Sequence, residues 1–199
     1  MNSMTRKSSE TRPAPCKRAT GFTLIETITV MSIVAILMAI GVPSYRYITT
    51  ANRMSSDING LLGDFQYARA EAIKEGQTVS VCATTDFVSC TTAGVAWQTG
   101  WLVFTDSPAL GTINGNDTVL RVQKAFSNQD TLQGDNTIRF VSFNREGFTT
   151  GLPGPITLTL HDAPAGWNAQ YTRCLSLSIV GAMSTQTAGQ TTAENVACT

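Results

Sequence analysis

A single carboxylate, Glu26, stands near the start of an otherwise uncharged, apolar stretch from Phe22 to Val42. As a helix this stretch is about 31 Å long, which matches a bilayer core of roughly 30 Å. A carboxylate costs on the order of 3 kcal/mol at the bilayer centre, but the eleven Phe, Leu, Ile and Val residues outweigh that cost. A charge in a membrane span is by default functional, so we expect Glu26 to have an ionic partner. The alternative is a charge that only snorkels to the headgroups.

The residues around Glu26 resemble a known processing site. The segment Gly21-Phe22-Thr23-Leu24-Ile25-Glu26, between a basic segment and an apolar span, is similar to the cleavage site of type IV prepilins and type II secretion pseudopilins. The resemblance implies that a prepilin peptidase cuts after Gly21, that the new amino-terminal Phe22 is N-methylated, and that Glu26 serves filament assembly. Pro43 falls where these proteins often carry a helix-kinking proline, and with Gly41 it predicts a kink.

Cleavage would give Glu26 its partner. It frees an α-amino group at Phe22, and in a bundle of staggered helices the carboxylate of one subunit can meet the terminal amine of another. Breaking such a buried pair costs several kcal/mol, so the pair could set the register of the filament. The resemblance also implies several partners: other pilins or pseudopilins of the filament, the prepilin peptidase and methylase, the inner-membrane assembly platform, and membrane lipid.

The charge distribution predicts the orientation of the chain. Residues 1–21 form the expected cleaved leader, with a net charge of +4, and the remaining 178 residues carry −4. Because basic flanks stay in the cytoplasm, we expect a single-pass inner-membrane protein whose C-terminal domain lies in the periplasm before it joins a pilus or pseudopilus. The alternative is a secretory signal ending at residues 39–41, but the apolar run is longer than a typical signal core.

The cysteines are interpreted after the leader is subtracted. Cys16 leaves with it, and four cysteines remain on the periplasmic side, where disulfides form: Cys82, Cys90, Cys174 and Cys198. Of the three possible pairings we prefer Cys82 with Cys90 and Cys174 with Cys198, because each closes a local loop or ties down a tail. The alternative is that one or two are buried free thiols.

The pattern after Pro43 predicts the rest of the fold. Residues 43–76 continue the helix with one apolar stripe: Met54, Ile58, Leu61, Leu62, Phe65 and Ile73. Residues 77–183 read as a periplasmic β-domain with strands at 77–83, 100–106, 118–126, 137–143, 155–160 and 172–180. Residues 184–199 read as a polar tail, loose unless Cys198 holds it. The fold class is α+β and type IV pilin-like, in which the long N-terminal helix, with 22–42 as its transmembrane and assembly part, packs on a small antiparallel β-domain.

Three segments narrow the resemblance to the GspH/FimT group, which comprises type II secretion minor pseudopilins and type IV pilus minor pilins such as FimT and FimU. They are residues 65–73, the motif Trp97-x-x-Gly100-Trp101-x-x-Phe104, and residues 173–178 followed by Gly181. We interpret Trp97, Trp101 and Phe104 as core residues rather than a ligand-stacking site. Some members of the group are implicated in DNA binding through basic residues after the late glycine, but here Gly181 is followed by Ala-Met-Ser.

No residue constellation predicts an enzyme. The one histidine, His161, lacks catalytic partners, and the chain has no Gly-rich phosphate loop or nucleophile elbow. A zinc site is not expected without a Cys-x-x-Cys motif. Asn114, Asn116 and Asp117 read as a turn rather than a calcium site, because the spacing of a calcium-binding loop is missing. We therefore expect no catalytic residues, no metal and no cofactor.

The expected function is structural. The chain is predicted to be a minor pilin or pseudopilin that is incorporated near the tip of a type II secretion pseudopilus or a type IV pilus, and so supports protein secretion or pilus assembly. Two alternatives stay open: a DNA-binding minor pilin in natural transformation, and a membrane-anchored periplasmic binding domain that never joins a filament. The net-acidic mature chain does not favour nucleic acid as a partner.

Overall fold

The computed structural model describes residues 21–92, 96–107, 109–126, 129–134, 138–162, 169–191 and 197–198. The chain divides into two units, Met1–Ser44 and Tyr45–Thr199. Helix α1 (Leu24–Glu75) begins in the first unit and ends in the second. The expected leader, residues 1–20 with Cys16, lies outside the described residues.

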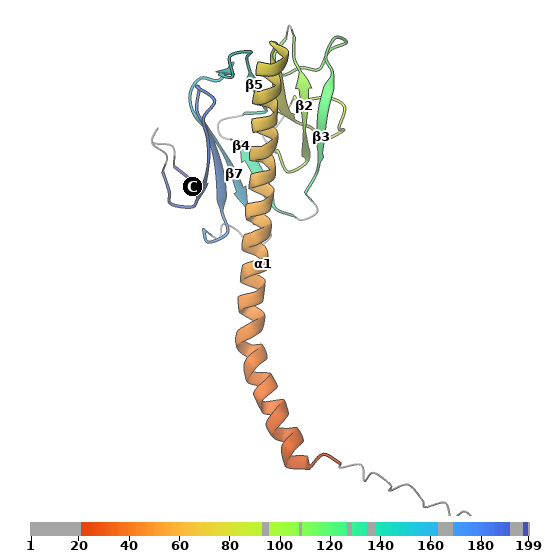
Figure 1. Ribbon diagram of the computed structural model, residues 1–199, viewed down its shortest axis with the longest axis vertical. Helices are drawn as coiled ribbons and strands as arrows, with labels where there is room; N and C mark the ends of the chain where they lie inside the picture. The colour runs from red at the N-terminus through yellow and green to blue at the C-terminus, as the bar shows by residue number, and fades with distance from the viewer. Residues whose placement is uncertain are drawn as a thin grey trace, which may run out of the picture. The chain divides into compact units, whose positions relative to one another are not determined.

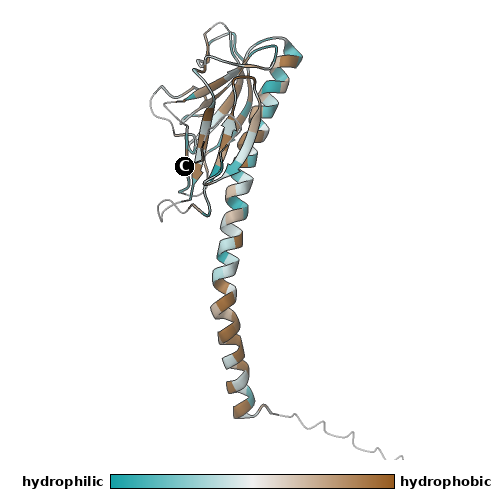
Figure 2. Cartoon of the chain, turned by 90° about the vertical axis from the view of Figure 1, so that its left-hand side faces the viewer, coloured by the Kyte–Doolittle hydropathy of each residue, from teal (hydrophilic) through white to brown (hydrophobic). Residues whose placement is uncertain are grey.

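The first unit contains the apolar part of α1. Thr23 caps the helix, because its Oγ1 accepts a hydrogen bond from the backbone N–H of Glu26 at 3.3 Å. Figure 2 shows this part of the helix as predominantly hydrophobic. The hydroxyls of Thr29 and Ser32 donate to backbone carbonyls three and four residues earlier, so neither is left without a partner in an apolar setting. Pro43 lies inside the helix, and the kink expected there stays a prediction.

In the second unit, α1 buries one face against the β-domain. The buried residues are Met54, Ile58, Leu61, Phe65, Ala68 and Ala72. The sequence prediction of this stripe was wrong at one position, since Ile73 is 51% exposed and Ala72 lies on the buried face instead. The small side chain of Ala72 is fully buried at this end of the helix, whereas Ile73 is only half covered. After Glu75 the backbone N–H of Gly76 donates to the carbonyl of Ala72, which ends the helix as expected.

The β-domain has two antiparallel sheets. Figure 1 shows β2 and β3 on one side of α1 and β7 on the other. The first has the order β3-β2-β1-β5-β6. Its strands are β1 (Val79–Ala83), β2 (Gly100–Thr105), β3 (Val119–Lys124), β5 (Phe140–Phe143) and β6 (Thr149–Thr150). Four of these were expected from the sequence; β6 was missed because it has only two residues.

The second sheet has the order β4-β7-β8-β9. Its strands are β4 (Thr131–Gly134), β7 (Ile156–His161), β8 (Arg173–Leu177) and β9 (Met183–Thr187). The segment 184–199 was expected to be a polar tail that is loose unless Cys198 holds it; Cys198 is bonded to Cys174, and the start of the segment also forms a strand, β9, which was not expected. This Ser-, Thr- and Gln-rich segment pairs with β8 from Arg173↔Thr187 to Leu177↔Met183, because backbone pairing at a sheet edge needs no apolar side chains.

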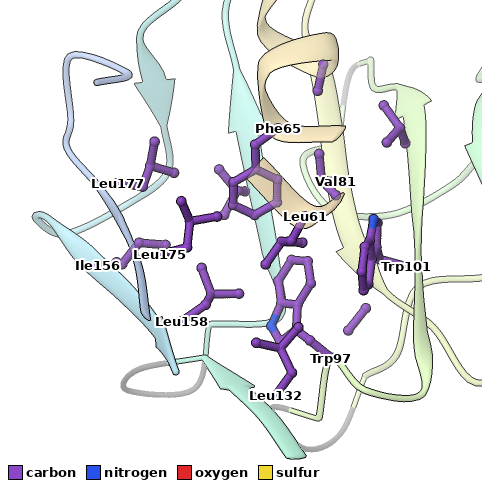
Figure 3. Packing of buried hydrophobic residues seen from close by; sticks show 14 of the residues in the cluster. Leu61, Phe65, Val81, Trp97, Trp101, Leu132, Ile156, Leu158, Leu175 and Leu177 are labelled. Carbon is purple, nitrogen blue, oxygen red and sulfur yellow. The ribbon is translucent and has the colours of Figure 1, made fainter. Parts of the chain in front are cut away.

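The hydrophobic core lies between α1 and the two sheets. Figure 3 shows Leu61 and Phe65 of the helix between Leu158 and Leu175 on one side and Val81 and Trp97 on the other. The Phe65 ring meets the ring of Trp97 edge-on, with centroids 5.9 Å apart. The core prediction for Trp97, Trp101 and Phe104 is confirmed, since none of them is more than 2% exposed.

A polar contact orients α1 over the first sheet. The indole Nε1 of Trp101 donates to Asp64 at 2.8 Å, and the guanidinium of Arg121 pairs with the same carboxylate at 3.0 Å. Arg121 also lies 3.6 Å above the ring of Tyr67. Residues from α1, β2 and β3 therefore meet at one carboxylate, which specifies how the helix is rotated on the sheet.

Two disulfides link parts of the β-domain to one another. Cys82 is bonded to Cys90, and Cys174 to Cys198, which are the pairings preferred from the sequence. The first bond closes the loop after β1. The second attaches the end of the chain to β8, next to β9.

Candidate assembly site

The segment from Gly21 to Glu26 is exposed throughout. The Phe22 side chain is 82% exposed, and Gly21 has no neighbouring atom within 4 Å of the position a Cβ would take. This backbone is therefore open to another molecule. The expected cleavage and N-methylation at Gly21 and Phe22 stay predictions.

The Glu26 carboxylate has no partner among the residues that the structure describes. Its backbone is held by the Thr23 cap, while its side chain lies on the exposed surface of the helix. A shallow groove of about 190 Å³ runs beside it, lined by Phe22, Glu26, Thr27, Val30 and Met31. The site thus combines one carboxylate with apolar walls. Such a site can bind a cationic group that is carried by another apolar helix.

The surface around this site is apolar on every side of the helix. Exposed apolar side chains follow one another along it: Leu24, Ile25, Ile28, Val30, Met31, Ile33, Val34, Ile36, Leu37, Met38, Ile40 and Val42. A helix packed on a soluble domain would bury one face of such a surface. Among the described residues, α1 is the one helix long and apolar enough to cross a membrane. Its exposed surface fits lipid or a bundle of similar helices.

His161 and Asp117 both make polar contacts within the β-domain. His161 is buried, its Nδ1 lies 3.2 Å from the hydroxyl of Thr172, and burial lowers the pKa of its imidazole. Asp117 accepts hydrogen bonds from the backbone of Ser107 and Asn114, which is the chemistry of a turn. Within the described ranges, no three His, Cys, Asp or Glu residues lie close enough to hold a metal ion.

Two polar arrangements in the β-domain were not predicted. The guanidinium of Arg69 on α1 donates to the carbonyl oxygens of Gly181 at 2.8 Å and Val180 at 3.4 Å, and so holds the turn between β8 and β9. The buried carboxylate of Asp106 accepts a hydrogen bond from the Ser80 hydroxyl, and burial raises its pKa. The partners are 112 and 26 residues apart, a separation at which local sequence patterns carry no signal.

Comparison with known protein families shows which family the chain belongs to. The model of the family described as type II transport protein GspH matches residues 57–181, which is more than half of the chain. The chain belongs to the GspH family. The prokaryotic N-terminal methylation motif also matches this GspH-family chain, over residues 16–42. It is a minor pilin or pseudopilin with a structural role, in a family of structural subunits.

A solved structure agrees with the fold of the GspH-family chain. A crystal structure of the type IV minor pilin FimU of Pseudomonas aeruginosa matches with a TM-score of 0.54 and 22% identity, over 70% of this chain and 92% of FimU. A second crystal form of FimU matches with a TM-score of 0.47 and 20% identity, over 69% and 90% of the two chains. No functionally curated protein matches the chain. The match to the first FimU structure confirms the pilin fold, one long helix on antiparallel sheets.

Proposed function

We propose that this GspH-family chain is a minor subunit that enters a type II secretion pseudopilus or a type IV pilus through its amino-terminal helix. A prepilin peptidase removes residues 1–21, Phe22 is N-methylated, and residues 22–42 hold the subunit in the inner membrane until assembly. The observation that carries the proposal is the Glu26 carboxylate, which is exposed and without a described partner on a helix whose surroundings are apolar.

The mechanism follows from the chemistry of the new amino terminus. Cleavage places a cationic amine at Phe22, four residues before Glu26, which becomes the fifth residue of the mature chain. Within one subunit, Phe22 and Glu26 both line the groove at the helix start. In a filament, the amine of one subunit meets the carboxylate of its neighbour, and a mispaired charge among apolar helices is penalised. The pair therefore selects one stagger between subunits.

The two disulfides and the charge asymmetry support a periplasmic β-domain. Disulfides persist in oxidising compartments, and both pairs lie in the second unit. The basic residues of the leader favour the cytoplasmic side. Contacts of the β-domain with other minor subunits, near the tip of the filament, complete the proposal. DNA binding is not proposed, because β9, which follows Gly181, contains no Arg or Lys.

The decisive experiment is the intact mass and amino-terminal sequence of the protein purified from its native membrane. The proposal requires a chain that starts at Phe22 and carries one added methyl group. A start near Val42 would instead mean an ordinary secreted domain. A start at Met1 would mean an anchored domain that is never processed, and the filament role would be wrong.

The type of filament is assigned by deleting the gene and measuring two activities in the same strain. Loss of protein secretion with normal pilus-dependent motility indicates a pseudopilus. Loss of motility with normal secretion indicates a pilus. The wild-type gene should restore the lost activity, whereas a copy with Gly21→Glu, which replaces the glycine before the proposed cut, should not. Normal secretion together with normal motility would contradict both assignments.

A further inference from the structure

Three residues with the chemistry of a membrane interface follow the apolar stretch. Tyr45 is 71% exposed and Tyr47 is 40% exposed, with the exposed Arg46 between them. Tyrosine rings have an apolar body and a polar tip, and they concentrate at the headgroup level of bilayers. An arginine there lays its stem along apolar surface and extends its guanidinium to phosphate. No described residue forms an ion pair with Arg46.

The β-domain adds a fourth residue of the same kind. The ring of Tyr171, just before β8, lies against the ring of Tyr47 with centroids 5.6 Å apart. Tyr171 is half-buried and packs against the hydrophobic core, so the domain determines its place. Tyr171 is therefore held at the level of Tyr47, on the same end of the domain.

We propose that Tyr45, Arg46, Tyr47 and Tyr171 form an interfacial belt that binds phospholipid headgroups on the periplasmic surface of the inner membrane before the subunit enters the filament. The belt rests on the proposed function, because it takes residues 22–42 as the membrane span. Chain continuity identifies the occupant. Tyr45 follows Val42 by three residues, about 5 Å along a helix, so chain continuity keeps Tyr45, Arg46 and Tyr47 next to the end of the span, and the ring contact with Tyr47 adds Tyr171 to them.

Two positions at opposite ends of the β-domain can be compared to test the belt. The turn at 144–147 is next to Ile73, because a Cβ added to Gly147 would lie 2.8 Å from the Ile73 side chain. Ile73 is 26 residues beyond Tyr47 on α1, which corresponds to about 39 Å. Exposed positions at the two ends, Ala169 and Glu146, should therefore lie at very different distances from the headgroups.

The experiment measures these distances in lipid. Full-length protein with Cys16→Ser is placed in vesicles of phosphatidylethanolamine and phosphatidylglycerol, with a nitrobenzoxadiazole label on Ala169→Cys, Glu146→Cys or Ser32→Cys. Quenching is measured with nitroxides on the lipid headgroup and on the middle of the acyl chain. We expect headgroup nitroxides to quench the label at 169 at least about threefold more than the label at 146, since 39 Å exceeds the range of contact quenching. Acyl-chain nitroxides should quench the label at 32.

Residue substitutions test the belt chemistry separately. Tyr45→Ser with Tyr47→Ser should reduce the quenching at 169, whereas Tyr45→Trp with Tyr47→Trp should retain it, because Trp is also an interfacial residue. Intrinsic fluorescence of the serine variant checks that the domain is folded. Equal quenching at 169 and 146, with the label at 32 quenched, would overturn the belt and leave the span intact. An unquenched label at 32 would overturn both the belt and the membrane part of the proposed function.

Discussion

At the residue scale, two carboxylates on the same helix have opposite surroundings. Glu26 lies on an exposed apolar surface with no described partner, while Asp64 receives hydrogen bonds from Trp101 and Arg121. The first carboxylate is available to another subunit. The second is used inside the molecule, where it orients α1 on β2 and β3.

Replacing Glu26 by Gln removes the charge and keeps the size. We expect normal membrane insertion and at least about a tenfold loss of incorporation into filaments, because the amine of the neighbouring subunit loses its partner. Immunoblots of sheared filaments against the membrane fraction measure this ratio. Glu146→Gln, which alters an exposed glutamate of the β-domain, is the control and should be incorporated normally. Normal incorporation of Glu26→Gln would exclude the ionic role.

Replacing Asp64 by Ala leaves the buried indole N–H of Trp101 without an acceptor. We expect the free energy of unfolding to fall by about 2 kcal/mol. Asp64→Asn retains an oxygen for Trp101 and loses only the pair with the half-exposed Arg121, so it should cost less than about 1 kcal/mol. Urea unfolding of the full chain in detergent, followed by Trp fluorescence, measures both. Equal losses in the two variants would mean that the Trp101 hydrogen bond is not the important contact.

At the element scale, a turn contact and a disulfide hold in place a strand, β9, whose sequence has little hydrophobic alternation. The turn between β8 and β9 is closed by Arg69 from α1, and the chain beyond β9 is attached through Cys198. Both contacts stabilise a polar edge strand that buries few apolar side chains of its own.

Alanine substitutions at two glycines of similar backbone conformation can distinguish the cost of backbone strain from the cost of steric crowding. Gly181 has φ +75° and Gly189 has φ +80°, but a Cβ on Gly181 would lie 2.4 Å from the carbonyl oxygen of Gly147, whereas a Cβ on Gly189 has no atom within 4 Å. Gly189→Ala should cost about 1 kcal/mol from the left-handed backbone alone. Gly181→Ala should cost at least about 2 kcal/mol more, since backbone must move. Thermal unfolding of the two variants gives the comparison, and equal midpoints would contradict it.

The disulfides differ in the length of chain they close. The sequence separation is 24 residues for Cys174–Cys198 and 8 for Cys82–Cys90. From loop entropy, we expect the double alanine variant of the longer loop to lose about 3.5 kcal/mol and that of the shorter loop about 2.6 kcal/mol. Urea unfolding measures both losses, and Cys16→Ser is the matched variant that should leave stability unchanged. A larger loss for the shorter loop would show that entropy does not dominate.

At the scale of the whole molecule, the core of the β-domain lies entirely within the second unit. The earliest buried residue of α1 is Met54, and the described residues before it expose their side chains or bury them partly. The first unit therefore has a surface suited to lipid or to other helices, while the second has a core of its own.

A chain that begins at Tyr45 is accordingly expected to fold in water. We predict a cooperative thermal transition within about 5 °C of the transition of the full chain in detergent, because no core side chain is removed. Near-ultraviolet circular dichroism and a mass that shows no free thiol check the packing and the disulfides. A truncated chain without fixed tertiary signals would show that the first unit is needed for folding.

Local patterns predicted the elements well where hydrophobicity and turns are strong. The helix stop at Gly76, the strands that become β1, β2, β3, β5, β7 and β8, and the burial of Trp97 and Trp101 all follow from such patterns. β4, β6 and β9 were missed because short or polar strands are specified by the neighbours they pair with. Ile73 was misplaced because an apolar residue at the edge of a stripe can be exposed when its neighbours are small.

The sequence by itself determined the chemistry of the amino-terminal segment and the class of the fold. A lone carboxylate in a bilayer-length apolar run, followed by helical and then alternating periodicity, depends on residues close together in the chain, so it can be recognised without coordinates. Only the tertiary structure decided the order of the strands, the meeting of Asp64 with Arg121, the hold of Arg69 on Gly181, and the contact of Tyr47 with Tyr171. Each of these joins residues tens to more than a hundred positions apart, and their proximity is set by packing of the whole domain around α1.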